Sequence, residues 1–436
     1  MSVARTLCAC CLALLTLTPI ARCAQTPKQL VDTGLAAAAA GKYPAAITDF
    51  NKAIALDPTY ARAYGNRGLA YTSTQKYDKA ILDYTTYLTL KPGSVDAYLA
   101  RAETYLAQQN YDLAIPDLTS AIRLKPDVEQ PYTIRAYAYM EKQQYDLSIA
   151  DYSKAITLKP DDPAALLTRG YAYGYKQEYD LAIADFSKSI ALMPDIENSY
   201  LTRAGAYVLT KDYDRAIADY TKCIALEPDS VYPYNGRAGA YSQKQSYDLS
   251  IADYTKSIAL KSDDPAVYVS RGYVYYEQQH YDLAVADYSS AITLKPDYEE
   301  AYACRGNAYN DTNQYPLAVA DCSKAIELKP DDEQTYVARA YAYWSMSQYD
   351  QAAQDGIKAT GLTPGDSQAQ LILGLIYATQ DKWDEAKSAL TLGLATATPE
   401  YITTYTNDAK YALAHNPNSL ALIKAVLLLQ SAPAPK

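Results

Sequence analysis

The apolar residues of the chain follow a helical period that is interrupted at regular intervals. From residue 27 onward, large or small apolar residues recur three and four positions apart, as they do on one face of an amphipathic helix. The segment 163–196 shows two such faces, formed by Leu166, Gly170 and Tyr173, and then by Tyr179, Ala182, Ile183, Phe186 and Ile190. Each stretch of this kind predicts two amphipathic helices joined by a short turn.

Proline ends nearly every stretch, always at a multiple of 34 residues from the last. Because proline restricts the residue before it and cannot continue a helix, we expect the second helix to end there. Ser262 fills the one missing place in the series Pro58, Pro92, Pro126, Pro160, Pro194, Pro228, Pro296, Pro330 and Pro364. This register divides the chain into eleven units, numbered internally from position 1 to 34: 27–60, 61–94, 95–128, 129–162, 163–196, 197–230, 231–264, 265–298, 299–332, 333–366 and 367–400.

The residues at fixed places in each unit resemble those of tetratricopeptide-repeat proteins. That family has Trp-x2-Leu-Gly-x2-Tyr, then Ala, Phe and Pro, over 34 residues. Here the pattern is Tyr-x2-Arg-[Gly/Ala]-x2-Tyr, then Tyr-Asp-x-Ala-Ile-x-Asp-Tyr and Pro. The resemblance implies an all-α fold, a right-handed superhelix (an α-solenoid) of stacked helix-turn-helix units. It also implies that the first helix of each pair lines a concave groove.

The ends of the array are expected to differ from its middle. One helix pair cannot bury its apolar face alone, so terminal units need a cap. In the last unit Thr398 stands at the position that proline occupies in nine of the other ten. We predict C-terminal capping helices within 401–430, one from Tyr401 to His415 and one from Ser419 to Gln430, and a disordered tail at 431–436.

The N-terminal segment 1–24 has the layout of a secretory signal peptide. Arg5 precedes an apolar run from Leu7 to Ile20, and small residues follow. We therefore expect an exported chain, periplasmic or secreted. A lipid anchor at Cys23 is the lesser alternative. The apolar run is too short to span a bilayer, so no transmembrane span is expected in the mature chain.

Composition narrows the range of functions. The formal net charge is −10, which argues against nucleic acid as a partner, since such surfaces are basic. Only two histidines are present, so zinc sites and Ser-His-Asp triads lack parts. We find no nucleophile–base set, phosphate loop or metal-ligand cluster, and predict that the chain is not an enzyme and needs no cofactor or metal.

Opposite charges recur in units 2 to 10, with Arg at position 7 and Asp at position 23. The interpretation we prefer is a structural ion-pair ladder, in which each guanidinium forks onto a carboxylate. A row of ligand-binding arginines is the alternative. Units 1 and 11 have Thr33 and Leu373 at position 7. The pairs are Arg67 and Asp83, Arg101 and Asp117, Arg135 and Asp151, Arg169 and Asp185, Arg203 and Asp219, Arg237 and Asp253, Arg271 and Asp287, Arg305 and Asp321, and Arg339 and Asp355.

Tyrosine is unusually common, with 46 residues beside two Phe and two Trp. Most tyrosines occupy positions 4, 11, 17 and 24, which we interpret as core-facing. A smaller aromatic set falls at positions 9, 12 and 13 of first helices, which by resemblance face the groove; packing against the neighbouring repeat is the alternative. With one methionine, this predicted groove set is Tyr137, Met140, Tyr171, Tyr175, Tyr273, Tyr276, Tyr341 and Trp344.

The cysteines and one sequon are the remaining features of the sequence that bear on its chemistry. Cys223, Cys304 and Cys322 are expected to be buried free thiols, although a bond between Cys304 and Cys322 stays open. Asn310-Asp311-Thr312 is a glycosylation sequon, relevant only if the source glycosylates secreted chains.

Together these features predict a non-catalytic protein–protein interaction scaffold that binds a peptide or protein segment in the concave groove. The alternative is a cell-envelope module that binds polysaccharide, or serves export assembly, through the aromatic groove.

Overall fold

A computed structural model describes residues 25–261 and 263–432 of the chain. The expected signal peptide at 1–24, with Cys23, lies outside the described residues, as do Ser262 and 433–436. Every regular element in the described residues is an α-helix. The chain forms two compact units, one ending at Asp195 and the other beginning at Ile196.

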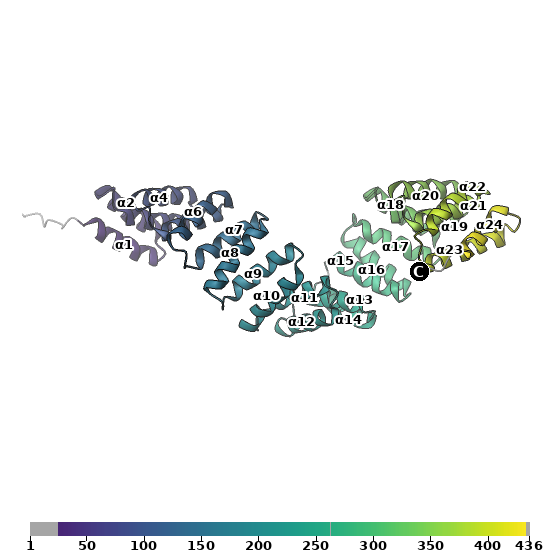
Figure 1. Cartoon of the computed structure of the whole chain (residues 1–436), viewed down its shortest axis with the longest axis horizontal. Helices are drawn as coiled ribbons and strands as arrows, with labels where there is room; N and C mark the ends of the chain where they lie inside the picture. The colour runs from purple at the N-terminus through teal and green to yellow at the C-terminus, as the bar shows by residue number, and fades with distance from the viewer. Residues whose placement is uncertain (1–24, 262, 433–436) are drawn as a thin grey trace, which may run out of the picture. The chain divides into compact units, whose positions relative to one another are not determined.

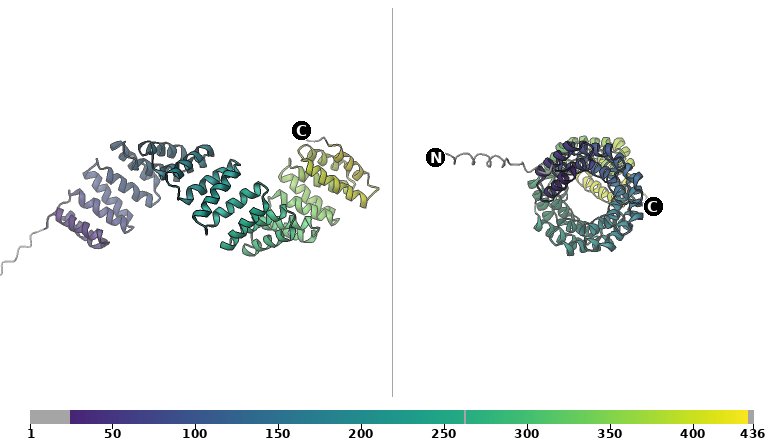
Figure 2. Two further views of the ribbon diagram at one scale, coloured as in Figure 1. Left: turned by 90° about the horizontal axis from the view of Figure 1, so that it is seen from below. Right: turned by 90° about the vertical axis from the view of Figure 1, so that its left-hand side faces the viewer.

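The helices form consecutive antiparallel pairs, visible in Figures 1 and 2. We call the odd-numbered helices α1 to α21 first helices and the even-numbered helices α2 to α22 second helices. The N-terminal unit contains α1 (Pro27–Ala39), α2 (Tyr43–Leu56), α3 (Ala61–Ser73), α4 (Tyr77–Leu90), α5 (Val95–Ala107), α6 (Tyr111–Leu124), α7 (Gln130–Glu141), α8 (Tyr145–Leu158), α9 (Pro163–Tyr175) and α10 (Tyr179–Leu192).

The C-terminal unit continues the same pairing and adds two helices after the last pair. It contains α11 (Glu197–Leu209), α12 (Tyr213–Leu226), α13 (Val231–Gln243), α14 (Tyr247–Leu260), α15 (Pro265–Glu277), α16 (Tyr281–Leu294), α17 (Glu299–Asp311), α18 (Tyr315–Leu328), α19 (Glu333–Ser345), α20 (Tyr349–Leu362), α21 (Ser367–Thr379), α22 (Trp383–Leu394), α23 (Pro399–His415) and α24 (Leu420–Gln430).

The helix α23 begins at Pro399, two residues before the Tyr401 that the sequence pattern suggested. The side chain of Thr398 caps it by accepting a hydrogen bond from the Tyr401 amide at 3.4 Å. Proline is tolerated in a first helical turn because its missing N–H has no helical partner there. The helix α24 buries Leu422 and Leu429 against the preceding repeats.

Small residues allow the two helices of a pair to approach closely. Alanines at positions 20 and 27, such as Ala284 and Ala291, are fully buried. At Gly272 an added Cβ would lie 2.7 Å from the ring of Tyr288, which is itself buried at position 24. In this repeat the core between the paired helices is therefore built from small residues on both sides of one large ring.

The prediction that tyrosines at positions 4, 11 and 17 face the core is confirmed in part: Tyr132 and Tyr207 are buried, and others such as Tyr275 pack against core clusters. These side chains are half-buried in most repeats, and the tyrosines at positions 4 and 11 flank the position-7 arginine. In one repeat the Arg271 guanidinium carbon lies 6.0 Å from the Tyr268 ring centre and 5.8 Å from that of Tyr275. Aromatic ring faces attract a guanidinium, so these tyrosines stabilise the arginine side chain by covering its charge.

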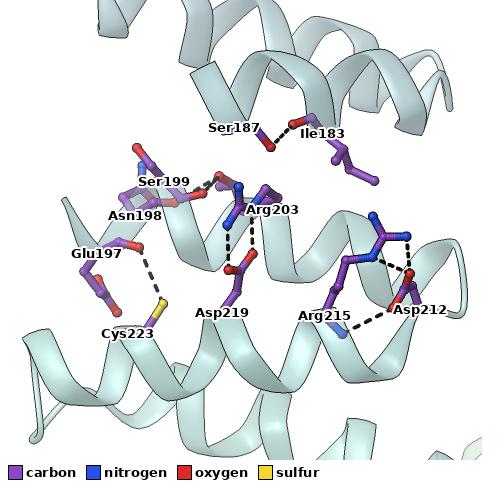
Figure 3. Close-up of polar contacts among 11 residues, drawn as sticks. Ile183, Ser187, Glu197, Asn198, Ser199, Arg203, Asp212, Arg215, Asp219 and Cys223 are labelled. Carbon is purple, nitrogen blue, oxygen red and sulfur yellow. Dashed lines mark hydrogen bonds and ion pairs between the residues drawn. The ribbon is translucent and has the colours of Figure 1, made fainter. Parts of the chain in front are cut away.

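Each position-7 arginine binds the position-23 aspartate of its own repeat through two parallel hydrogen bonds. The Arg Nε–Asp Oδ2 distance is 2.6–2.8 Å and the Arg Nη2–Asp Oδ1 distance is 2.6–2.9 Å across all nine pairs. Figure 3 shows this fork for Arg203 and Asp219. The aspartates are buried, so the pairs hold the two helices of each repeat together.

The third arm of the same guanidinium reaches the repeat before it. Arg Nη1 donates to a side-chain oxygen at position 25 of the preceding second helix, at 2.6–3.0 Å. The acceptors are Asn51, Thr85, Thr119, Ser153, Thr221, Thr255, Ser289 and Ser323. One side chain therefore joins three helices from two repeats.

We predict that breaking one half of a pair costs more than removing the whole pair. Arg339→Leu leaves the buried Asp355 carboxylate without its partner and should lower the free energy of unfolding by about 3–5 kcal/mol. Adding Asp355→Ala should recover about 2 kcal/mol or more. The native last repeat has Leu373 and Ala389 at these two positions, so the apolar pair fits the fold. Urea unfolding of both single variants and the double variant checks this, and strictly additive losses would contradict it.

A second repeated feature lies in the turn between the paired helices. The residue at position 15 has a positive φ in ten repeats where it is not glycine, for example 58° at Gln143, and Gly41 has 72° in the first repeat. The Gln144 amide donates to the Tyr139 carbonyl at 2.9 Å, closing the helix end. Left-handed backbone is unfavourable for residues with a Cβ, so each such turn costs stability.

We expect Gln143→Gly to raise the free energy of unfolding by about 0.5–1 kcal/mol, because glycine adopts positive φ without the steric cost. Gln144→Gly is the matched control, since φ is −89° there and glycine only adds entropy to the unfolded chain. That variant should be less stable than the native chain. Equal destabilisation by both substitutions, measured by urea unfolding, would refute the strain at position 15.

Candidate functional site

The first helices of successive repeats touch one another, and this defines the inner face of each unit. In the N-terminal unit contacts join the first helices α1, α3, α5 and α7. In the C-terminal unit they join the first helices α11, α13, α15, α17, α19 and α21. Within each unit, a second helix packs on the first helix of its own repeat and, where another repeat of that unit follows, on the first helix of the next repeat. Within a unit, first helices therefore lie on the side where the repeats are closest together.

The position-7 arginine decides which residues face inward. On an α-helix successive residues are separated by about 100°, so positions 2, 5, 9 and 12 lie opposite position 7. Because the arginine points at the second helices, these four positions form the opposite face of the first helix. We call this surface, made of positions 2, 5, 9 and 12 of the first helices within one unit, the inner face.

The N-terminal unit has a hollow on its inner face. A cavity of about 360 Å³ lies between α5 and α7, lined by Glu103 and Leu106 from α5 and by Thr133, Ile134 and Tyr137 from α7. Four of these five residues are at positions 5, 9 or 12. Partial burial against its neighbours raises the pKa of the Glu103 carboxyl.

The C-terminal unit has a larger hollow, which we call the α23 cavity. Its volume is about 500 Å³. Four first helices and the helix α23 contribute to it, so the final repeats and a non-repeat helix enclose it together. The lining residues are Tyr276, Asn307, Asn310, Asp311, Gln334, Val337, Ala338, Tyr341, Gln368, Glu400, Tyr401, Thr404, Tyr405 and Asp408.

Polar groups of the α23 cavity are held in place by neighbours from other helices. The Asn310 amide nitrogen donates to the Ala338 carbonyl at 2.9 Å. The Tyr276 hydroxyl donates to the Asp311 carboxylate. Burial is the first cause that raises the pKa of Tyr276, and the neighbouring carboxylate adds to it. The cavity wall is therefore ordered by contacts between α15, α17 and α19.

The structure separates the predicted groove set into two groups, four residues in each unit. Tyr137 lines the hollow of the N-terminal unit, and Tyr276 and Tyr341 line the α23 cavity. Tyr273, at position 9, is 49% exposed and lies in neither cavity lining. Tyr175 is 66% exposed and stacks on Tyr145, with ring centres 5.2 Å apart.

The remaining three members lie elsewhere. Trp344 is 7% exposed and its Nε1 donates to Thr379 Oγ1 at 3.0 Å, so it packs against the next repeat and does not present its ring to a groove. The ring of Tyr171 is half-buried and meets Phe186 edge-on at 5.7 Å. Met140 is half-buried and lines neither cavity. For Trp344 the alternative of packing against the neighbouring repeat is the correct one.

Two other motifs are settled by their surroundings. Asn310 of the sequon is 8% exposed and its amide is hydrogen-bonded, so the folded chain does not offer it to a glycosylating enzyme. Cys223, Cys304 and Cys322 are free thiols. Burial raises the pKa of each to about 12, which leaves them unreactive at neutral pH.

Sequence reasoning missed the part of the cavity that α23 supplies. A signal was present, since Glu400, Thr404 and Asp408 recur every four residues and Tyr401 and Tyr405 run beside them. This spacing places polar and aromatic side chains on one face of a capping helix. Position 2, occupied by Gln334 and Gln368, was also overlooked.

Comparison with protein families accounts for most of the chain. Models described as tetratricopeptide repeat match residues 61–94 and 299–332, 95–128, 163–196 and 197–230, and 337–401. A model described as TPR repeat matches 34–75, 136–177, 240–279 and 272–311. The chain belongs to the tetratricopeptide-repeat family. Its all-α fold of paired helices is that of the family, whose repeats form protein-interaction scaffolds.

Several solved structures are similar to this tetratricopeptide-repeat chain. Yeast Tom70 is 18% identical, with 92% of this chain and 99% of that chain covered and a TM-score of 0.42. The C-terminal part of a repeat protein from Cytophaga hutchinsonii is 22% identical, with coverage of 54% and 97% and a TM-score of 0.49. YrrB, described as having an unusual peptide-binding site, is 19% identical, with coverage of 42% and 95% and a TM-score of 0.37. A search of curated proteins found no match.

The described residues also bear on metal binding and on crossing a membrane. Residues 25–261 and 263–432 contain no group of three or more histidine, cysteine, aspartate or glutamate side chains placed to hold a metal ion. In the same residues, no helix combines the length and the apolar character that crossing a membrane requires.

The carboxylate of Asp408, on the capping helix α23, lowers the stability of the folded chain when it is ionised. Burial raises the pKa of Asp408 to about 6, although interaction with the Tyr341 hydroxyl opposes the rise. In the unfolded chain an aspartate titrates near 3.9. The folded state therefore binds the proton more tightly, and the free energy of unfolding falls as the pH rises from about 4 to about 6.

We predict that Asp408→Asn stabilises the C-terminal unit at pH 7.5 by on the order of 1–2 kcal/mol, because it removes a buried charge. At pH 4, where Asp408 is protonated in the folded state, the gain should vanish. Urea unfolding at both pH values checks this. Asp297→Asn, an exposed turn residue of the same unit, is the control and should change stability by less than about 0.5 kcal/mol. A gain that is the same at both pH values would contradict the account.

Proposed function

We propose that this tetratricopeptide-repeat protein is a non-catalytic scaffold that holds an extended segment of a partner protein against its inner face. The observation that carries the proposal is that each unit has a cavity lined mainly by first helices at inner-face positions, with α23 completing the one in the C-terminal unit. Surface side chains at position 9, such as Tyr137 and Tyr273, add aromatic contact area beside polar groups.

The packing of the repeats supports recognition by a surface formed in advance. The arginine forks, in repeats 2 to 10, and the buried small residues fix the first helices before any partner arrives. A partner segment would then meet side chains whose backbone needs no ordering, so the entropy cost of binding falls mainly on the segment. Tyrosine is suited to such contacts because a ring and a hydroxyl share one rigid side chain.

The test is selection of binding peptides from a random display library with the full chain as bait. We expect enriched peptides, and we expect Tyr137→Ala or Tyr273→Ala to weaken peptides bound in the same unit by about tenfold, as loss of an aromatic anchor does. The matched controls are Leu147→Ala on α8 and Leu283→Ala on α16, which truncate side chains of similar exposure on second helices.

Those leucine variants should bind as the native chain does. Equal weakening by the leucine and tyrosine variants would contradict binding at the inner face. Retention of polysaccharide with no enriched peptide would overturn the proposal in favour of a glycan-binding module.

A further inference from the structure

The charged side chains that line the α23 cavity are all acidic. Three carboxylates line it, from Asp311, Glu400 and Asp408. Among the described residues that line the cavity there is no lysine, arginine or histidine. A group with positive charge would therefore meet attraction from both sides, because α17 and α23 each supply acidic side chains.

Two buried oxygens of the cavity residues lack partners. Only 8% of the Asn310 surface is exposed. Within the described residues its Oδ1 accepts no hydrogen bond. Its orientation is fixed, because the amide nitrogen is needed as the donor to the Ala338 carbonyl. Asp408 Oδ2 is likewise buried and meets no donor at hydrogen-bond distance in the described residues, although the Tyr341 hydroxyl interacts with this carboxyl. Unpaired buried acceptors are costly, and a ligand with N–H donors removes that cost.

Aromatic rings complete the cavity. Tyr276, Tyr341, Tyr401 and Tyr405 come from three different helices and line the cavity together with the acidic groups. The hydroxyls of two of them already donate within the protein, Tyr276 to Asp311 and Tyr405 to the Gln368 carbonyl at 3.4 Å. Their ring faces attract cations, while their protons are occupied.

We propose that the α23 cavity receives the cationic side chain of a lysine or arginine carried by the bound partner segment. An ammonium or guanidinium group offers three to five N–H donors and no acceptor, which matches a cavity rich in carboxylate and unpaired amide oxygen. This inference rests on the proposed function, because the segment held along the inner face brings the side chain to the cavity.

The dimensions and the energetics of the cavity agree with this occupant. A volume of about 500 Å³ falls within the range of small-molecule sites and leaves space for a long side chain with bound water. Asp408 is ionised at neutral pH although burial disfavours its charge. A residue that lowers stability while lining a cavity is typical of a binding site, where function is gained at the expense of the fold.

The first experiment uses isolated side-chain analogues as probes, independent of any partner. Acetyl-arginine-amide and acetyl-lysine-amide are titrated into the full chain at pH 7.5 and followed by ligand-observed NMR. Their neutral counterparts are acetyl-citrulline-amide and acetyl-norleucine-amide. We expect at least one cationic probe to bind at least tenfold more tightly than its neutral counterpart. Equal affinity for charged and neutral probes, or no binding of either, would overturn the proposal.

The second experiment separates a binding role from a structural one. Asp408→Asn should weaken the cationic probe by at least tenfold, although the same change makes the protein more stable. Asp297→Asn removes the same charge outside the cavity and should leave the affinity within twofold of the native value. Binding that survives Asp408→Asn unchanged, or that falls equally in both variants, would show that this cavity does not hold the cation.

Peptides enriched by display distinguish the two proposals from one another. In peptides bound by the C-terminal unit, replacement of each lysine by norleucine and each arginine by citrulline should weaken binding at least tenfold at one position. If no replacement matters, the cavity proposal fails and the scaffold proposal stands. If cationic probes bind but no peptide is enriched, two claims are overturned: that the cation comes from a bound segment, and that the inner face holds such a segment.

Discussion

The structure depends on one repeated interaction, the guanidinium that joins three helices. Two of its arms fork onto a buried aspartate of the same repeat, and a third arm reaches a hydroxyl or amide oxygen of the repeat before. A lysine could not make this contact, because only the planar fork presents donors in several fixed directions. The interaction also sets the rotation of the first helix about its own axis. Because position 7 is turned toward the second helices, positions 2, 5, 9 and 12 form the inner face.

Much of this organisation could be predicted from the sequence because each repeat contacts little beyond its neighbours. The period of 34 residues and the constant spacing from Arg271 to Asp287 and its equivalents are local signals. The third arm was missed, although position 25 is Asn, Ser or Thr before every position-7 arginine, and Ile357 precedes Leu373. The contact of the tyrosines at positions 4 and 11 with the arginine was not predicted, because helical period alone does not separate a ring in the core from a ring beside a charge.

The α23 cavity could not be predicted in this way, because its last wall is not a repeat. Where α23 docks depends on tertiary packing against α21 and α24, which no period encodes. The same helix that caps the apolar end of the array also supplies Glu400 and Asp408. Trp344 shows the reverse case: its position suggested an open groove, yet the hydrogen bond to Thr379 holds its ring inside the next repeat.

The central claim is that the inner face of the first helices is the binding surface. Amide hydrogen exchange of the full chain, with and without a display-selected peptide, tests it most directly, since a bound segment slows local opening of the helices it contacts. For a peptide held by the C-terminal unit, the account predicts added protection in α15, α17, α19, α21 and α23, with little change at the exposed ends of α16, α18 and α20. Protection concentrated in those second helices would contradict it.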